Sequence, residues 1–259
     1  MHHLFKGEGL PLSQGAFDEV AETLATDAAK LWAVIEIEAM RCGFLEDKRP
    51  VILFERHIFH RYTKSRFDSD YPDLSNSIPG GYGKGGASQY SRLERAVALD
   101  REAALRSTSW GLGQVMGFNA EIAGFASASE MVRDMCQSED AQLRGMMNFI
   151  LHNGLHKPLR VGNWTSFAAG YNGPKHYIND YAGRLRGAFN KYSTGPMPDL
   201  RIRAAQLYLT YHGYDPGLID GWLGPRTIRA LNDFRASVGR KEADELTHED
   251  LEQLMTLSR

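Results

Sequence analysis

Residues 27–42, DAAKLWAVIEIEAMRC, decide the fold. Asp27 is a residue type that caps helix N-termini, and Gly43, which follows the stretch, is typical of a helix end. Almost every residue between these two positions is apolar, and a helix that is apolar on all sides is buried. The stretch therefore predicts a buried central helix. Its polar exceptions before the last turn are Lys30, Glu36 and Glu38.

The two glutamates of this helix point in nearly opposite directions, because residues two apart differ by about 200° around a helix axis. At most one of Glu36 and Glu38 can therefore face a given cleft. A carboxyl group held among apolar side chains near a helix C-terminus has a raised pKa, which suits an acid that protonates a glycosidic leaving group. The pattern leaves open which glutamate is the acid, and whether either instead pairs with an arginine. The arginines considered are Arg41, Arg49 and Arg56.

Most of the surrounding sequence also favours helices. Residues 138–154 show helical apolar spacing after Ser138, which is suited to an N-cap, and Ser127 with Glu130 forms the pattern of a capping box. Residues 50–55 are the best strand candidate. The sequence predicts a mainly α fold, with an α+β domain that is mostly helical and contains a small β element.

A proline-rich seam divides the chain. Pro196 and Pro198 interrupt helical hydrogen bonding, so we place a domain boundary between residues 1–195 and residues 196–259. The sequence of residues 196–259 predicts three short helices, which would form a three-helix bundle with a marginal core. These helices are expected to begin near Leu200, Pro225 and Thr247.

Composition and charge argue against several classes of protein. The 259 residues carry a net charge of −2, and neither part has the basic excess of a nucleic-acid binder. No stretch approaches the roughly 18 apolar residues of a membrane span, and no polycationic tail predicts stable membrane association. Cys42 and Cys136 are expected to be free thiols, and no histidine pattern predicts a metal site, so we expect no metal and no cofactor.

Residues 35–44, IEIEAMRCGF, resemble the catalytic helix of the N-acetylmuramidase family of phage endolysins, which is related to goose-type lysozymes and lytic transglycosylases. That family typically has a glutamate six residues before the Phe of a Gly-Phe pair, and this glutamate is Glu38. Family members often have small residues after it, whereas Ala39, Met40, Arg41 and Cys42 follow here. Family-like stretches then occur in order at 53–57 (LFERH), 109–117 (SWGLGQVMG), 163–164 (NW) and 171–173 (YNG). The resemblance covers roughly residues 15–192 and implies a lysozyme-like fold with Glu38 as the catalytic acid.

The same motifs supply candidate substrate-binding residues. The resemblance implies that Tyr171 and Asn172 line the site near the acid, while core packing of Tyr171 is the alternative. Small residues around Ser109 let the backbone approach a sugar, and the Gln114 amide can bond to an N-acetyl group. The alternative for this stretch is a glycine-rich turn that packs Trp110 into the core.

The second catalytic group is the least determined part of the site. Glu55 is the candidate, because hydrolysis of a glycosidic bond commonly uses a second carboxylate as base or nucleophile. It could equally belong to a structural ion pair with Arg56 or His57. The remaining possibilities are that no second carboxylate is needed or that an acid of the long glycine-rich loop at residues 68–89 serves. Those acids are Asp68, Asp70 and Asp73.

The C-terminal part carries a second resemblance. Residues 213–227, GYDPGLIDGWLGPRT, resemble the signature of the three-helix peptidoglycan-binding domain, although Arg235 stands where that family usually has Gln. Its Asp-Pro-Gly and Asp-Gly pairs are turn formers, so much of the motif is structural. The candidate cell-wall-binding residues are Tyr214, Asp220 and Trp222.

The resemblances together imply a monomeric endolysin whose partner is the peptidoglycan glycan strand. It would hydrolyse the β-1,4 bond between N-acetylmuramic acid and N-acetylglucosamine; the alternatives are a lytic transglycosylase and a non-catalytic wall-binding protein. The N-terminal residues MHHLFKGEGLPLSQG do not predict a secretory signal peptide. We therefore expect synthesis in the host cytoplasm and action on the cell wall after release by a separate pore-forming protein.

Overall fold

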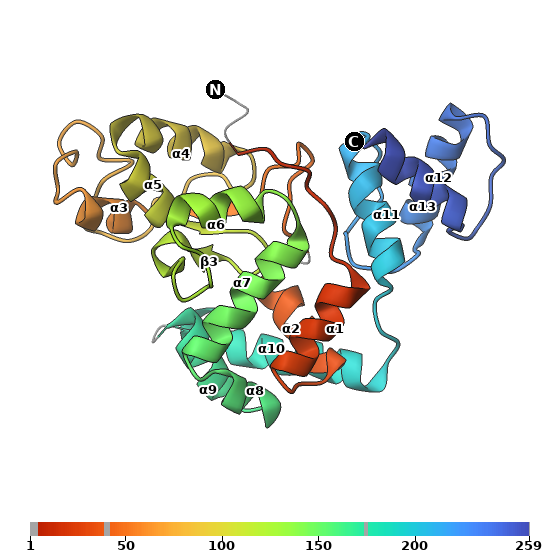
Figure 1. Ribbon diagram of the computed structural model, residues 1–259, viewed down its shortest axis with the longest axis horizontal. Helices are drawn as coiled ribbons and strands as arrows, with labels where there is room; N and C mark the ends of the chain where they lie inside the picture. The colour runs from red at the N-terminus through yellow and green to blue at the C-terminus, as the bar shows by residue number, and fades with distance from the viewer. Residues whose placement is uncertain (1–4, 39–41, 174–175, 259) are drawn as a thin grey trace.

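The computed structural model describes residues 5–38, 42–173 and 176–258, and it is mainly helical (Figure 1). The first helices are α1 (Gln14–Thr23), α2 (Ala28–Glu38), α3 (Arg56–Tyr62), α4 (Ser88–Leu99) and α5 (Arg101–Arg106). They are followed by α6 (Ala128–Met135), α7 (Glu139–His152), α8 (His156–Arg160), α9 (Trp164–Asn172) and α10 (Tyr181–Thr194). The last helices are α11 (Leu200–Tyr211), α12 (Pro225–Ser237) and α13 (His248–Leu257). Two 3-10 turns, η1 (Gly117–Asn119) and η2 (His176–Asn179), complete the helical elements of the described residues.

One small sheet lies among these helices. Its strands are β1 (Ile52–Phe54), β2 (Thr108–Trp110) and β3 (Val115–Met116), in antiparallel order β1-β2-β3. Leu53 pairs with Ser109, and Ser109 in turn pairs with Met116. The predicted strand and the predicted small β element are thereby confirmed, and the sheet brings the chain after β1 beside the turn between β2 and β3.

The predicted central helix is α2. The side chain of Asp27 accepts a hydrogen bond from the backbone N–H of Lys30 at 2.9 Å, which caps the helix start. Leu31, Val34 and Ile35 are completely buried in the main hydrophobic core. Helix α10 lies along α2, and α1 also packs against it (Figure 1). Packing on more than one side explains why the sequence of α2 is apolar all round.

The predicted caps are present, with one difference. Ser138 accepts a bond from Ala141 N at the start of α7, and the helix ends close to the predicted position. Ser127 caps α6 by accepting from Glu130 N at 3.1 Å. The Glu130 carboxylate bonds to Ala126 N at 2.8 Å rather than returning to Ser127, so the predicted capping box is only half formed.

The three C-terminal helices begin where the sequence predicts, and they share a hydrophobic cluster separate from the main core (Figure 1). Thr247 and Asp250 form a complete capping box at the start of α13. Arg235, the departure from the family pattern, forms an ion pair with Asp250 in which both side chains are buried. It also donates to two backbone carbonyls of the loop before α13, which gives this arginine a structural explanation.

Candidate active site

Glu38 and Glu36 point to different partners, as the geometry of a helix requires. Asn172, the last residue of α9, donates from Nδ2 to both carboxylate oxygens of Glu38, at 3.2 and 3.0 Å. Glu36 instead accepts bonds from Lys191 Nζ at 3.1 Å and from the Tyr192 hydroxyl, both on α10. The two carboxyl groups of α2 therefore have distinct environments.

The arginines considered as partners for these glutamates are engaged elsewhere where the structure describes them. Arg49 pairs with Asp47, and Arg56 donates to the backbone carbonyl of Ile78. Arg41 lies outside the described residues.

The surroundings of Glu38 raise the pKa of its carboxyl group to near neutral pH. Burial raises the pKa of Glu38 to about 7, while the hydrogen bond from Asn172 and the positive charge of Arg184 act in the opposite direction. The side chain still reaches solvent in part, although protein surrounds its carboxyl group closely. A carboxyl group with a pKa near 7 retains its proton in a large fraction of molecules at neutral pH, which is the property of a general acid.

The end of α9 connects Glu38 to the sheet. The Tyr171 hydroxyl donates to the carbonyl oxygen of Gly113 at 2.6 Å, and its ring stacks on Phe167 with centroids 5.5 Å apart. The next residue, Asn172, faces Glu38. Its Oδ1 is buried and has no hydrogen-bond partner among the described residues, so it is an acceptor left available beside the acid. Tyr171 therefore shows features of both interpretations. It precedes the residue that bonds to Glu38, and its ring packs against Phe167.

Ser109 and Gln114 are brought together, and they bond to each other. The Ser109 hydroxyl donates to Gln114 Oε1 at 2.8 Å, and Gln114 Nε2 donates to Gly111 O at 2.8 Å and to Val51 O at 3.1 Å. These bonds hold the turn between β2 and β3, in which Gln114 adopts a φ of +46°. Trp110 is completely buried, as the alternative interpretation of this stretch expected. The substrate-binding roles of Ser109 and Gln114 remain predictions.

Glu55 follows β1 and precedes α3. The Tyr82 hydroxyl donates to Glu55 Oε1 at 3.1 Å. His57 Nδ1 lies 3.1 Å from Glu55 Oε2, but not in hydrogen-bond geometry. The glycine-rich loop thus contacts Glu55 through Tyr82, and no motif of the sequence predicts this contact. Its catalytic role remains a prediction.

Two of the three loop acids are engaged in contacts outside this arrangement. Asp68 accepts a hydrogen bond from Ser75 Oγ and contacts His60 Nδ1, and these contacts lower the pKa of Asp68. Asp73 pairs with Arg95, which lowers the pKa of Asp73 in the same way. Both acids therefore have partners other than Glu38 and Glu55.

The C-terminal helices contain a pocket of about 310 Å³. Asp220 and Trp222, two of the three predicted wall-binding residues, line it together with the exposed Leu218. Gln206 shapes the pocket by accepting from Asp220 N at 2.9 Å and by donating to Trp222 O at 3.0 Å. Tyr214 is not part of its lining, because the Tyr214 ring packs against Phe234 and its hydroxyl donates to Ser237.

The remaining reactive groups do not form a further centre in the part of the chain that the structure describes. Cys42 and Cys136 are free, and burial raises the pKa of each thiol to about 12. Within residues 5–38, 42–173 and 176–258, no group of three or more acidic, histidine or cysteine side chains could hold a metal ion. In those same ranges, no helix has the length and apolar character needed to cross a membrane.

Comparisons with known proteins place the chain in a family. The sequence model of the family described as N-acetylmuramidase matches residues 27–193, from the cap of α2 to the end of α10. The crystal structure of the Burkholderia AP3 phage endolysin is similar, with 38% sequence identity and a TM-score of 0.65. The similar region covers 71% of this chain and 71% of that one. No curated protein matches this sequence.

Proposed function

Because this chain belongs to the N-acetylmuramidase family of glycoside hydrolases, we propose that it is an endolysin that cleaves peptidoglycan with Glu38 as its general acid. The proposed bond is the β-1,4 linkage between N-acetylmuramic acid and N-acetylglucosamine. The observation that carries the proposal is the environment of Glu38. Burial raises the pKa of this carboxyl group to about 7, and its hydrogen-bond partner Asn172 carries no charge.

The proposed reaction begins with proton transfer from Glu38 to the glycosidic oxygen. The bond from that oxygen to the anomeric carbon then breaks, and positive charge develops on the sugar ring. Water attacks the anomeric carbon, and the proton that water loses restores the protonated state of the catalytic groups. The Asn172 amide and the charge of Arg184 stabilise the Glu38 carboxylate that forms in the first step.

We assign Glu55 as the base that assists the attacking water. Its position after β1 joins it to the sheet that also carries the turn contacted by Tyr171. Asn172 Oδ1 is proposed to accept a hydrogen bond from an amide N–H of the substrate, because this buried oxygen has no partner among the described residues. Ser109, Gln114 and Tyr171 are proposed to keep the surrounding turn in place for the sugar.

The replacement Glu38→Gln tests the proposed acid, because glutamine preserves shape and removes the proton. We expect the rate of cleavage of purified peptidoglycan to fall by at least about a hundredfold. Glu36→Gln is the matched control, since Glu36 lies on the same helix and bonds to Lys191. It should retain near wild-type cleavage when assayed where it is folded.

Two outcomes would contradict the proposal. Wild-type clearing of peptidoglycan by Glu38→Gln would exclude Glu38 as the acid. Mass spectrometry of the released fragments tests the use of water, because products with a 1,6-anhydro end would show that a sugar hydroxyl attacks instead. The expected products carry an ordinary reducing end.

We further propose that residues 196–259 bind the cell wall. The pocket lined by Asp220 and Trp222 supports this role, since it is concave and combines a carboxylate with an aromatic ring. Attachment to the wall would raise the effective concentration of glycan at the catalytic domain.

A further inference from the structure

A buried ion pair joins the C-terminal helices to the main body. Glu139 is the first residue of α7 and Arg203 lies in α11, and their side chains are 0% and 1% exposed. Arg203 donates from Nη2 to Glu139 Oε1 at 2.6 Å and from Nη1 to Oε2. Such a pair is costly to bury unless its hydrogen bonds are complete, and removal of one partner leaves an uncompensated charge.

The hydrogen bonds of Glu139 are complete. Besides Arg203, Gly43 N donates to Oε1 at 2.8 Å and Leu12 N donates to Oε2 at 2.9 Å. Burial acts to raise the pKa of Glu139, but the charge and hydrogen bonds of Arg203 and the two backbone donors hold it below its usual value. Glu139 is therefore ionised, and the N-terminal position in α7 favours that charge.

Glu139 and Gln142, which lie one helical turn apart on α7, accept hydrogen bonds from two separate parts of the chain. Gly43, which Glu139 fixes, follows Glu38 by five residues. Gln142, on the same helix, accepts from Leu112 N at 2.7 Å, next to the Gly113 carbonyl that the Tyr171 hydroxyl contacts. Gly43 and the turn between β2 and β3, which Tyr171 contacts, are thus both hydrogen-bonded to the first turn of α7.

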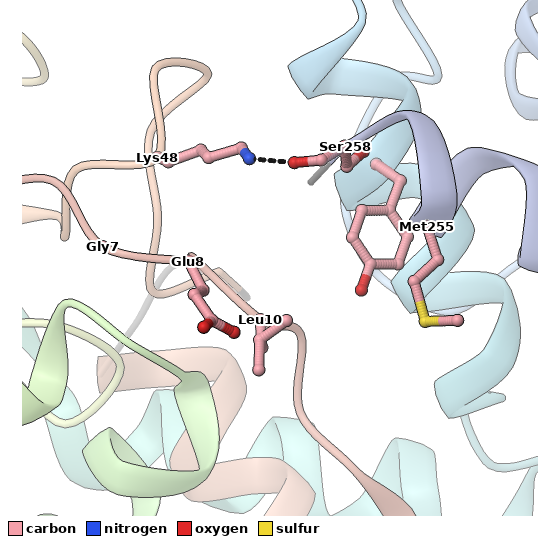
Figure 2. Close-up of a pocket in the computed structure, with 7 residues that line it drawn as sticks. Gly7, Glu8, Leu10, Lys48, Met255 and Ser258 are labelled. Carbon is pink, nitrogen blue, oxygen red and sulfur yellow. Dashed lines mark hydrogen bonds between the residues drawn. The ribbon is translucent and has the colours of Figure 1, made fainter.

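The rest of the junction combines apolar packing with hydrogen bonds, since Leu200 belongs to the main hydrophobic core and Trp222 packs against it. The Tyr211 hydroxyl donates to Gly9 O at 2.7 Å, and Lys48 Nζ donates to Ser258 O. Figure 2 shows Lys48 and Ser258 meeting across a cavity, whose volume is about 520 Å³. The pair of Glu139 and Arg203, which is buried and doubly hydrogen-bonded, is the ion pair that joins α7 to α11 at this junction.

We propose that Arg203 is a positioning residue for catalysis. It holds Glu139 charged and oriented, and with Glu139 the first turn of α7. From this turn Gln142 accepts a bond from Leu112 N, beside the Gly113 carbonyl that Tyr171 contacts, and the next residue, Asn172, bonds to Glu38. The C-terminal helices would then support the active site in addition to binding the wall. This inference rests on the proposed role of Glu38.

The test compares Arg203→Met with Arg235→Met on short soluble glycans, where wall binding contributes nothing. Arg235 is the matched control, because its ion pair with Asp250 is equally buried but lies within the C-terminal helices. We expect Arg203→Met to lower kcat by about tenfold or more at unchanged KM, and to move the alkaline limb of the pH profile. Arg203→Lys should recover part of kcat, since lysine keeps the charge with fewer hydrogen bonds.

Arg235→Met should lower the melting temperature but leave kcat and the pH limb unchanged at a temperature where it is folded. The same kcat and pH profile for Arg203→Met as for the wild type would overturn the inference. Should Arg203→Met not fold, the double variant Arg203→Met/Glu139→Met removes the uncompensated charge. Its kcat should remain low, and a return to the wild-type kcat would also overturn the inference.

Glu38→Gln separates the two proposals. If that variant is inactive and Arg203→Met behaves as the wild type, only the role of Arg203 fails. If Glu38→Gln remains active, the proposed acid fails and the inference built on it fails as well.

Discussion

At the scale of single residues, burial, the Asn172 amide and the charge of Arg184 together set the pKa of Glu38. Burial raises the pKa of its carboxyl group, and the amide of Asn172 and the charge of Arg184 offset this only in part. Glu36, two residues earlier, has the cation Lys191 at 3.1 Å. The same residue type on one helix is therefore suited to proton donation at one position and to an ion pair at the other.

The raised pKa of Glu38 predicts a dependence of stability on pH. Its folded-state value of about 7 exceeds its ordinary value of 4.5, so the folded protein binds this proton more tightly than the unfolded chain does. The associated stability is present at pH values below the ordinary pKa and is lost as pH rises through the folded pKa, by about 3 kcal/mol in total. Glu38→Gln, which does not ionise, should therefore be more stable than the wild type at pH 8 and equal to it near pH 4.

Denaturant unfolding at the two pH values measures this difference. Glu36→Gln serves as control and should gain no stability at pH 8, because it loses the contact with Lys191. An identical pH dependence of stability in Glu38→Gln and the wild type would contradict the raised pKa.

At the scale of elements, the first turn of α7 accepts hydrogen bonds from several distant parts of the chain. Gly43 was expected to end the central helix, yet its backbone does not have the positive φ of a typical helix-ending glycine. A Cβ at this position would lie 1.9 Å from Gln142 Oε1, so close packing against α7 explains the glycine. Glycine is required there for space rather than for backbone freedom.

Gly43→Ala tests this packing. The variant must displace Gln142, and we expect its free energy of unfolding to fall by about 1–3 kcal/mol. Gly15→Ala is the control, because its Cβ in α1 would meet no atom within 4 Å and should not destabilise the protein. Chemical denaturation of both variants gives the comparison; equal stabilities would show that Gln142 moves aside at no cost.

Local signals predicted the elements well. The N-caps Asp27, Ser138 and Thr247 were recognisable because each acts within three or four residues of sequence. The apolar run of α2 correctly predicted burial, and its two-residue spacing correctly separated Glu36 from Glu38.

Those local sequence patterns could not predict contacts between distant parts of the chain. Arg184 near Glu38 and Tyr82 on Glu55 carry no distinctive sequence pattern, because they reach the site only through the packing of α10 and the course of the glycine-rich loop. The pair of Glu139 and Arg203 is separated by 64 residues, and an isolated charge in a sequence does not indicate a buried partner.

At the scale of the whole molecule, two hydrophobic clusters coexist, and the smaller one belongs to α11, α12 and α13 (Figure 1). The pocket proposed to bind the wall opens within that smaller part. It predicts that Leu218→Ser weakens binding to purified sacculi. Leu218 is 62% exposed, so its loss should leave the fold intact while removing apolar contact area from the pocket.

Leu257→Ser is the matched control for that prediction, because Leu257 is 55% exposed on α13 and does not line the pocket. Co-sedimentation with sacculi should show about a threefold or greater loss of affinity for Leu218→Ser, as expected when an exposed side chain that becomes partly buried on binding loses its apolar atoms. Equal binding by both variants would place the wall contact elsewhere.

The ion pair between α7 and α11 sets a condition on recombination of this chain with other modules. Residues 196–259 look like an exchangeable unit, since they have their own cluster and their own buried pair of Arg235 and Asp250. A chimera that replaces them nevertheless leaves the Glu139 carboxylate buried without a countercharge, unless the incoming helix supplies an arginine in the place of Arg203. Positions 139 and 203 therefore have to be transferred, or neutralised, together in any redesign of the enzyme's binding specificity.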